Sequence, residues 1–433
     1  MNNHDNIFAL SSGRGKSGVA VIRISGNNLQ EFAKEIIGHN TITPRKTYFT
    51  NLRDDTGEII DQCIVIFFAA PHSFTGTDII EIQCHGAPAV INKIFEFLRG
   101  HNMRIATPGE FSRRAFYNGK MDLSDVDGLV ALLDAKTDRQ RAAALTSMMG
   151  GDSEIYTDWR RHMLEISAYA AAMTDYPADD LPPDISNTII SHIKTLYTAI
   201  SAALNKYSVS HAIQCGINIV IVGETNVGKS SLFNRIVGAS RAIVSDIPGT
   251  TRDVVSAQMD IDGYMVNLSD TAGLRDTTDK IERIGIKRTT NEIENADIII
   301  HVITPTDSVM TVKKDEILVV NKSDTTDSKR IKNAIYVSAK TGAGIPDLMK
   351  TITERINEMS GGGESVLMIN ARTYDLIKTA ADELKNAMSI AGDDYDILSE
   401  HVRYAADAIG KILGVISTDE VLDMTFSQLC LGK

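Results

Sequence analysis

The stretch that decides the fold is Gly223-Glu-Thr-Asn-Val-Gly228-Lys229-Ser230, which matches the pattern GxxxxGK[ST]. The apolar run INIVIVG (217–223) predicts a buried strand before the pattern, and a helix is expected after it. In that setting the glycines let backbone N–H groups surround a β-phosphate at the helix N-terminus. Lys229 would neutralise phosphate charge, and Ser230 would bind Mg²⁺. The expected nucleotide contacts here are Asn226, Val227, Gly228, Lys229, Ser230 and Ser231.

Three further motifs follow in the order that a guanine-nucleotide site requires, and they exclude a glycine-rich turn without a ligand. Asp270-Thr271-Ala272-Gly273 ends an expected strand, from which it can reach the Mg²⁺ shell and the γ-phosphate. In Asn321-Lys322-Ser323-Asp324, the Asp324 carboxylate can accept from N1–H and the 2-amino group of guanine, which adenine lacks. A backbone N–H of Ser338-Ala339-Lys340 can donate to guanine O6. The sequence therefore predicts a GTP-binding domain.

A segment with two threonines, Pro248-Gly-Thr250-Thr251-Arg-Asp253, lies between the first two motifs. In GTPases, a threonine of such a segment binds Mg²⁺ and responds to the γ-phosphate. We therefore expect Thr250 and Thr251 at the nucleotide, with Thr251 and Ser230 as the protein ligands of Mg²⁺.

The composition is that of a soluble protein, with 433 residues, 43% hydrophobic and 23% charged. No run of about 18 apolar residues predicts a membrane span, and no signal peptide is evident at the N-terminus, so we expect a cytoplasmic protein. The net charge of −12 disfavours nucleic-acid binding over the whole surface, so any RNA contact would need a local basic patch or a basic partner. The four cysteines form no CxxC pair, which argues against a zinc ribbon.

The pattern of apolar and polar residues along the chain predicts an α/β fold combined with a helical domain. Residues 1–118 read as mixed α/β, 119–214 as helical, 215–358 as alternating strands and helices, and 359–433 as helical again. The alternation predicts βαβ units and a mostly parallel sheet. The simplest topology is a helical domain interrupted by an inserted G domain. Within the first segment we expect strands at 19–25, 63–69 and 79–86 and a helix at 88–100.

Beyond the G motifs, four stretches resemble the MnmE (TrmE) family of tRNA-modification GTPases. They are SGRGKSGVAVIRISG, SFTGTDIIEIQCHG, TPGEFSRRAFYNGKMDLSDVDGLVALLDA and LCLGK. GETNVGKSSLFN, SDIPGTTRD and DTAGLRD are similar to the wider Era/MnmE/EngA group of translation-factor-related GTPases. The resemblance covers essentially the whole chain. It implies an N-terminal α/β domain that binds tetrahydrofolate, a discontinuous helical domain and an inserted Ras-like P-loop G domain.

The resemblance also implies partners and chemistry. It implies a homodimer through the N-terminal domains, and a heterotetramer or larger assembly with the FAD protein MnmG. Together these proteins would add an aminomethyl or carboxymethylaminomethyl group at C5 of the wobble uridine of tRNA. The one-carbon unit would come from a reduced folate, 5,10-methylene- or 5-formyl-tetrahydrofolate. The rival hypothesis is an Era-type ribosome-assembly G protein that uses GTP as a timer, but the helical, acidic C-terminal segment disfavours it.

The residues that would carry hydrolysis differ from those of many small GTPases. After DxxG, where those proteins carry a water-orienting Gln, this chain has Leu274. The resemblance implies that Glu282 acts through water, although by residue type alone it would be an exposed carboxylate at a helix start. It also implies that K⁺ replaces an arginine finger. If K⁺ does not act in this way, Arg252 and Arg275 are the candidates for such an arginine. The implied K⁺ ligands are Asn226, Ser245, Ile247 and Thr250, with Ser245 also at the nucleotide.

Arg23 interrupts an apolar strand, and a charge within a buried strand needs a partner. One interpretation is a structural ion pair. The resemblance implies a folate site instead, in which Glu81 binds the donor edge of the pterin and cations face the glutamate-tail carboxylates. Its implied residues are Arg23, Glu81, Lys120 and Lys433. Cys430 in LCLGK occupies a family motif and is a candidate functional residue, although a lone cysteine is usually a small buried hydrophobe.

Overall fold

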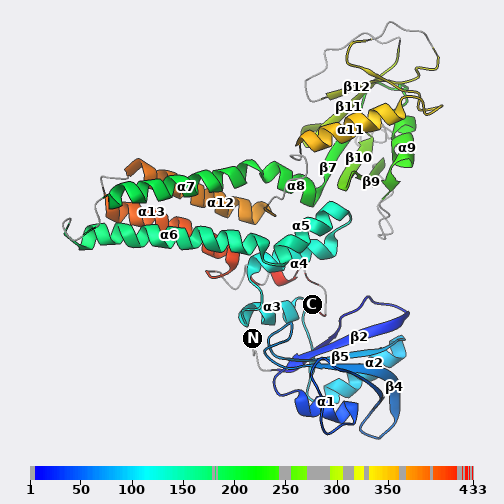
Figure 1. Ribbon diagram of the computed structural model, residues 1–433. Coiled ribbons are helices and arrows are strands. Elements are labelled where there is room, and N and C mark those ends of the chain that lie inside the picture. The colour runs from blue at the N-terminus through cyan, green and yellow to red at the C-terminus, as the bar shows by residue number, and fades with distance from the viewer. Residues whose placement is uncertain are drawn as a thin grey trace, which may run out of the picture. The chain divides into compact units, whose positions relative to one another are not determined.

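The computed structural model describes residues 5–177, 181, 184–242, 255–270, 293–305, 316–325, 331–359, 367–390, 394–416, 422, 425–427, 429 and 432. The chain forms two compact units (Figure 1). Unit 1 comprises Met1–Val130, Ser147–Pro177 and Tyr395–Lys433, and unit 2 comprises Ala131–Thr146 and Ala178–Asp394.

Unit 1 begins with a six-stranded sheet of order β3-β4-β5-β2-β1-β6, antiparallel except for the parallel pair β1 and β6. Helices α1 and α2 pack on one face of this sheet, against a core of alternating apolar strand residues. The alternation places every second side chain on the opposite face. The strands and helix predicted from the sequence are therefore confirmed. Their bounds are β1 Ile7–Leu10, β2 Ser17–Gly26, β3 Thr47–Arg53, β4 Ile59–Phe68, β5 Asp78–Gly86, β6 Arg104–Ile105, α1 Gln30–Ile37 and α2 Pro88–Gly100.

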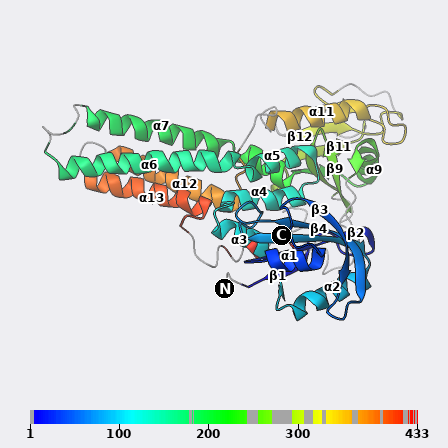
Figure 2. The same cartoon turned by 60° about the horizontal axis from the view of Figure 1, so that its bottom comes forward.

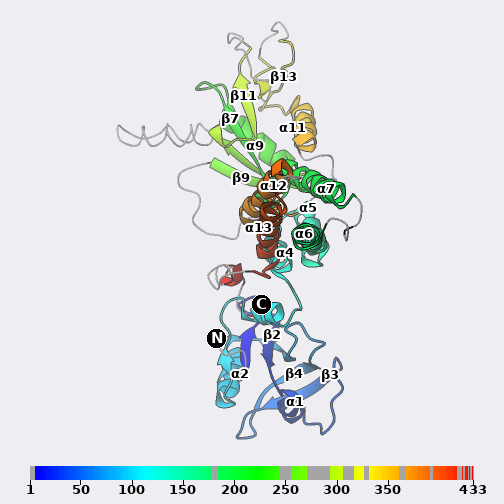
Figure 3. The same cartoon turned by 90° about the vertical axis from the view of Figure 1, so that its left-hand side faces the viewer.

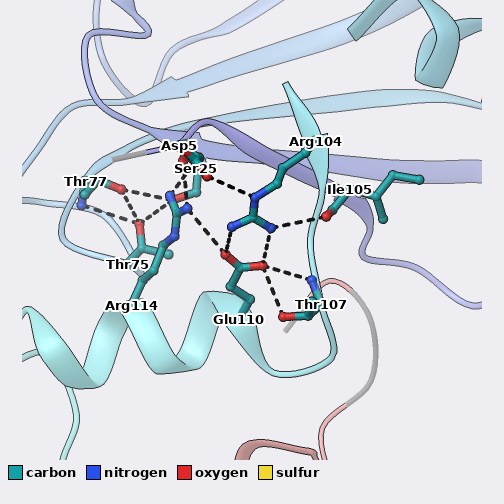
Figure 4. A network of polar contacts seen from close by, with 9 residues as sticks. All are labelled: Asp5, Ser25, Thr75, Thr77, Arg104, Ile105, Thr107, Glu110 and Arg114. Carbon is teal, nitrogen blue, oxygen red and sulfur yellow. Dashed lines mark hydrogen bonds and ion pairs between the residues drawn. The ribbon is translucent and has the colours of Figure 1, made fainter. Parts of the chain in front are cut away.

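A buried charge network holds α3 (Glu110–Tyr117) against this sheet (Figure 4). Arg104 donates to both carboxylate oxygens of Glu110, over 2.9 and 2.6 Å. Arg114, which is only 3% exposed, donates to the backbone carbonyls of Asp5 and Ser25 and lies 3.5 Å from Glu110. Burial alone would raise the pKa of the Glu110 carboxyl, but hydrogen bonds led by those from Arg104 lower it. The carboxylate therefore stays ionised and compensates the buried arginine.

The helical part of unit 1 is built on α6 (Gly151–Asp175) and α13 (Tyr395–Leu413), which lie side by side in Figure 2. Their buried residues recur every three or four positions, as an apolar stripe requires. On α6 these are Tyr156, Trp159, Met163, Ile166 and Ala170, and on α13 they include Leu398, Val402, Ala405, Ile409 and Ile412. Two segments far apart in the sequence thus form one helical core.

Unit 2 contains a seven-stranded sheet of order β13-β12-β11-β7-β10-β9-β8, seen with its helices in Figure 3. The strands from β13 to β10 are parallel, while β9 and β8 are antiparallel additions at one edge. This confirms the mostly parallel sheet predicted for residues 215–358. The bounds are β7 Ile217–Val222, β8 Arg241–Ala242, β9 Val255–Ile261, β10 Tyr264–Asp270, β11 Ile298–Ile303, β12 Glu316–Val320, β13 Ile335–Tyr336, α9 Lys229–Ala239 and α11 Ile345–Met359.

Unit 2 also includes helices that precede and follow the sheet strands along the chain. Helices α7 and α12 pack against each other, and α8 connects α7 to β7. The start of α5 is fixed to the hairpin β9–β10, because Arg139 stacks over the ring of Tyr264 at 4.1 Å and donates to its hydroxyl over 2.7 Å. The remaining bounds are α4 Leu123–Asp134, α5 Asp138–Met148, α7 Ile185–Asn205, α8 Tyr207–Cys215 and α12 Ala371–Ile390. The compact units thus divide the segment 119–214, whose boundaries as a domain stay a prediction.

Candidate functional site

The loop between β7 and α9 has the backbone shape that the GxxxxGK[ST] pattern requires. Gly223 and Gly228 have φ angles of 150° and 95°, and Asn226 between them has φ 63°. A Cβ on Gly223 would lie 2.3 Å from the carbonyl oxygen of Val302, and one on Gly228 would lie 2.4 Å from Nδ2 of Asn321. Both glycines are therefore required by conformation and by space.

The charged groups of this loop are held in place by its own backbone. Lys229 is 7% exposed, and its Nζ donates to the carbonyls of Gly223 and Glu224 over 3.0 and 2.7 Å. The ammonium is thus folded back over the loop in which the phosphates would lie. The hydroxyl of Ser230 donates to Oδ2 of fully buried Asp270 over 2.6 Å. The start of α9 and the end of β10 therefore present oxygen ligands side by side, which suit Mg²⁺.

The motifs Asn321–Asp324 and Ser338–Lys340 lie at the same edge of the sheet, because parallel strands end together there. Asn321, 2% exposed, donates through Nδ2 to the carbonyl of Val227 over 2.9 Å and accepts from the backbone N–H of Ala339 over 3.1 Å. Lys322 donates from Nζ to the carbonyl of Asn226 over 2.6 Å. The motif that follows β12 thus ties the phosphate loop to the Ser338–Lys340 loop.

The surroundings of Asp324 favour the ionised form of its carboxyl group. A hydrogen bond with Ser338 lowers the pKa of the Asp324 carboxyl, and the charge of Lys340 adds to the effect. The carboxylate is therefore ionised at neutral pH and can only accept hydrogen bonds, as pairing with N1–H and the 2-amino group of guanine requires.

A second cluster lies on the sheet of unit 1, on the face opposite α1 and α2. Arg23 and Glu81 are register partners on β2 and β5 and form an ion pair of 2.8 Å, with side chains 20% and 18% exposed. Arg23 Nη1 also donates to the carbonyl of Gly432 over 3.4 Å, and Ser11 donates to the same oxygen over 3.0 Å. The partner that Arg23 requires is therefore Glu81, and Gly432 lies beside the pair.

The loop between β4 and β5 connects this pair to Lys120. The guanidinium of Arg23 lies 5.6 Å from the ring centre of Phe74 in that loop. A Cβ on Gly76 of the same loop would lie 3.3 Å from Cε of Lys120, which is exposed. Three of the four residues predicted for a folate site thus border one region of unit 1.

Family models match nearly all of the chain. The model described as GTP-binding protein TrmE N-terminus matches residues 6–120, and the MnmE helical domain matches residues 123–430. The chain belongs to the MnmE (TrmE) family. A relative named tRNA modification GTPase MnmE, from Parvibaculum lavamentivorans, is 37% identical over 99% of this chain and 100% of the relative. Its namesake from Azorhizobium caulinodans is 37% identical over 99% of each chain. A solved structure of Aquifex aeolicus Era bound to GDP and AlF4⁻ is 23% identical, with a TM-score of 0.27, over 38% of this chain and 66% of that one.

Several residues predicted from the G motifs or from the MnmE resemblance lie outside the described residues. They are Ser245, Ile247, Thr250, Thr251, Thr271, Ala272, Gly273, Glu282, Cys430 and Lys433. Their roles stay predictions. Within the described ranges, no cluster of three His, Cys, Asp or Glu residues could hold a metal ion, and no helix is long and apolar enough to cross a membrane.

The structure adds one residue that the MnmE and G motifs do not mark. Arg235, on the exposed side of α9, donates to the carbonyls of Ala339 and Lys340 over 3.1 and 2.7 Å. No signal in the sequence could identify it, because its partners are brought to it only by the folding of unit 2.

Proposed function

We propose that this chain hydrolyses GTP to drive modification of C5 of the wobble uridine in tRNA, together with MnmG and a reduced folate. As a member of the MnmE family, the chain is a GTPase. The observation that carries the proposal is the convergence of the phosphate loop, Asp270 and the two base motifs at one edge of the parallel sheet. The tRNA substrate is proposed because the relatives are tRNA modification GTPases by name.

The residues at this edge fit the parts of a GTP molecule. The backbone N–H groups of the phosphate loop and the start of α9 would bind the β-phosphate, and Lys229 would compensate charge on the β- and γ-phosphates. Asp324 would accept from the base, and a backbone N–H of the Ser338–Lys340 loop would donate to O6. Bound Mg²⁺ would neutralise phosphate charge, and Ser230 beside Asp270 has the oxygen atoms to hold it, with Thr251 as the proposed second ligand.

For hydrolysis, we propose that K⁺ supplies the positive charge that an arginine finger supplies elsewhere. Asn226 would bind it, with Ser245, Ile247 and Thr250, and Glu282 would position water in place of a Gln. What supports the proposal is Leu274 after DxxG, which cannot orient water, and Asn226, whose exposed side chain extends from the phosphate loop.

Hydrolysis is expected to be about tenfold or more faster in KCl than in NaCl at equal ionic strength. Asn226→Gly should remove this advantage and leave GTP affinity largely intact, because glycine adopts the φ of 63° freely and Lys229 still holds the phosphates. Phosphate release with saturating GTP and Mg²⁺ measures both. Asn234→Ala, which removes an exposed amide on α9, should keep the K⁺ advantage. Equal wild-type rates in the two salts would contradict the K⁺ proposal and favour Arg252 or Arg275.

We also propose that the Arg23–Glu81 region binds a reduced folate, with Lys120 and Lys433. Glu81 already accepts from a guanidinium through one carboxylate oxygen, Oε1, at 2.8 and 3.0 Å. Its other oxygen can accept from the donor edge of a pterin. The ring of Phe74, which is 37% exposed and lies 5.6 Å from the Arg23 guanidinium, offers apolar surface for a flat ligand.

Glu81→Gln is expected to reduce the affinity for 5-formyl-tetrahydrofolate about tenfold or more, because a neutral amide loses both the charge-assisted bonds to Arg23 and one acceptor site. Isothermal titration calorimetry on the full chain measures the change. Glu31→Gln, which removes an exposed carboxylate of α1 that pairs with Lys34 on its own helix, is the matched control. Absence of heat with wild-type protein would exclude the folate role, and an unchanged affinity in Glu81→Gln would move the site elsewhere.

Homodimer formation through the N-terminal sheets is proposed as well. Phe49 and Ile64 are register partners on β3 and β4, they lie on the face opposite the helices, and they are 72% and 37% exposed. Val19 on β2 is 59% exposed. Exposed apolar side chains gathered on a sheet face are typical of an interface with another protein.

We further propose that the protein is located in the cytoplasm. The proposed domain boundaries are 1–118, 119–214 with 359–433, and 215–358.

The alternative of an Era-type assembly factor has no observation in its favour. After unit 2's sheet the chain forms α12 and α13, where an RNA-binding module would be required. Both helices complete helical cores with segments that precede the sheet, α7 and α6.

A further inference from the structure

Arg235 links the helix that begins at the phosphates to the loop that would contact the base. Its Nε donates to the carbonyl of Ala339 over 3.1 Å, and its Nη2 donates to the carbonyl of Lys340 over 2.7 Å. The two acceptors are successive in the chain, so the planar guanidinium spans the peptide between them. Lysine could supply only a point charge at this place.

The loop that Arg235 contacts is a compact turn with its own internal bonds. The N–H of Ser338 donates to the carbonyl of Ala343 over 2.9 Å, and the N–H of Gly342 donates to the carbonyl of Ser338 over 2.8 Å. Gly344, with φ 72°, allows a close approach to Tyr336, whose carbonyl oxygen would lie 1.9 Å from a Cβ at that position. The loop therefore forms one compact piece, and its position depends on what attaches it to the phosphate site.

Two attachments approach this piece from different elements. Asn321, at the end of β12, accepts from the N–H of Ala339 and donates to the phosphate loop. Arg235 holds the opposite group of the same residue, its carbonyl, from α9. Asn321 belongs to the motif shared by G proteins, whereas Arg235 does not. The pair fixes both ends of the Ala339 residue relative to the start of α9.

We infer that Arg235 is a positioning residue for base recognition, which sets the Ser338–Lys340 loop at the distance from the phosphate loop that guanine O6 requires. The inference rests on the proposed nucleotide site. Because Arg235 acts through the loop and not on the phosphates, its loss should weaken GDP and GTP equally. It should also spare the contact of Asp324 with the 2-amino group.

The surroundings of Arg235 are open to solvent, so its replacement should not disturb the fold. The side chain borders a cavity of about 540 Å³ that is open to solvent and lies between α9 and the residues from Ala339 to Pro346. Removing the guanidinium leaves the two carbonyls accessible to water, so no buried polar group loses its partner. Arg235→Ala is therefore expected to fold with an unchanged melting temperature.

The test compares Arg235→Ala, Arg235→Lys and wild-type full chain by stopped-flow release of fluorescent GDP and by competition with GTP and inosine triphosphate. Arg235→Ala should release GDP about tenfold faster, and Arg235→Lys should fall between, because one of two charge-assisted bonds can be retained. Inosine keeps O6 but lacks the 2-amino group, so the GTP-to-inosine-triphosphate affinity ratio should not change. KM should rise while kcat stays near wild type, as for uniform binding.

Lys350→Ala is the matched control, because it removes an exposed cation from α11 of the same unit without touching the loop. Release of GDP from Arg235→Ala at the rate of wild type and of this control would overturn the inference, as would a collapse of the GTP-to-inosine-triphosphate ratio. Wild-type protein that binds ATP as tightly as GTP would instead refute the proposed nucleotide site itself.

Discussion

Asp324→Asn is expected to lower the affinity for GTP by about 10²-fold or more and to raise the affinity for xanthosine triphosphate. The carboxylate of Asp324 is kept ionised by its hydrogen bond with Ser338 and by the charge of Lys340, so it accepts from both N1–H and the 2-amino group. Asparagine cannot accept twice, but its amide can donate to the 2-oxo group of xanthine. Competition against fluorescent GDP, with Mg²⁺ present, measures both affinities.

The matched control for this exchange is Asp347→Asn, in the first turn of α11, where the carboxylate is exposed to solvent. It should leave the preference for GTP unchanged. If Asp324→Asn also kept the wild-type order of GTP over xanthosine triphosphate, Asp324 would not contact the base.

Lys229→Ala is expected to reduce GTP turnover by about 10²–10³-fold, because the ammonium compensates charge that develops on the phosphates. The carbonyls of Gly223 and Glu224 accept from Nζ and hold the ammonium at the phosphate loop. Phosphate release under saturating GTP, Mg²⁺ and KCl measures turnover. Thermal melting should show that the variant is folded.

Lys350→Ala again serves as the control for loss of a cation, and it should hydrolyse GTP at the wild-type rate. Turnover and GTP affinity of Lys229→Ala that both stay within about threefold of wild type would show that the phosphates bind elsewhere. A variant with normal turnover and weakened binding alone would limit Lys229 to ground-state binding.

The convergence of the nucleotide motifs could be predicted from the sequence because each motif is local. A phosphate loop is a backbone conformation that depends on two glycines, here Gly223 and Gly228, and each of the other motifs lies at the end of a strand. Once the strands are parallel, their ends meet at one edge, so Asp270, Asn321 and Ser338 had to converge. The mostly parallel sheet of the G domain and the strands of the N-terminal segment were predictable for the same reason, from apolar runs and alternation.

Contacts between distant segments could not be predicted in this way. Nothing in the residues around Arg235 or Arg139 shows which carbonyl or ring each will meet, because those partners lie on other elements. For Arg23 the sequence left two interpretations, and the ion pair with Glu81 satisfies the first without excluding a ligand that shares it. The position of Gly432 beside Arg23 likewise depends on the fold of the whole unit.

The most direct test of the proposed function is mass spectrometry of wobble uridines in tRNA from a strain that lacks this chain. The account predicts loss of the aminomethyl or carboxymethylaminomethyl group from C5, with restoration by wild-type protein and by Lys350→Ala but not by Lys229→Ala. Wobble uridines that keep the full modification in the deletion strain would contradict the account.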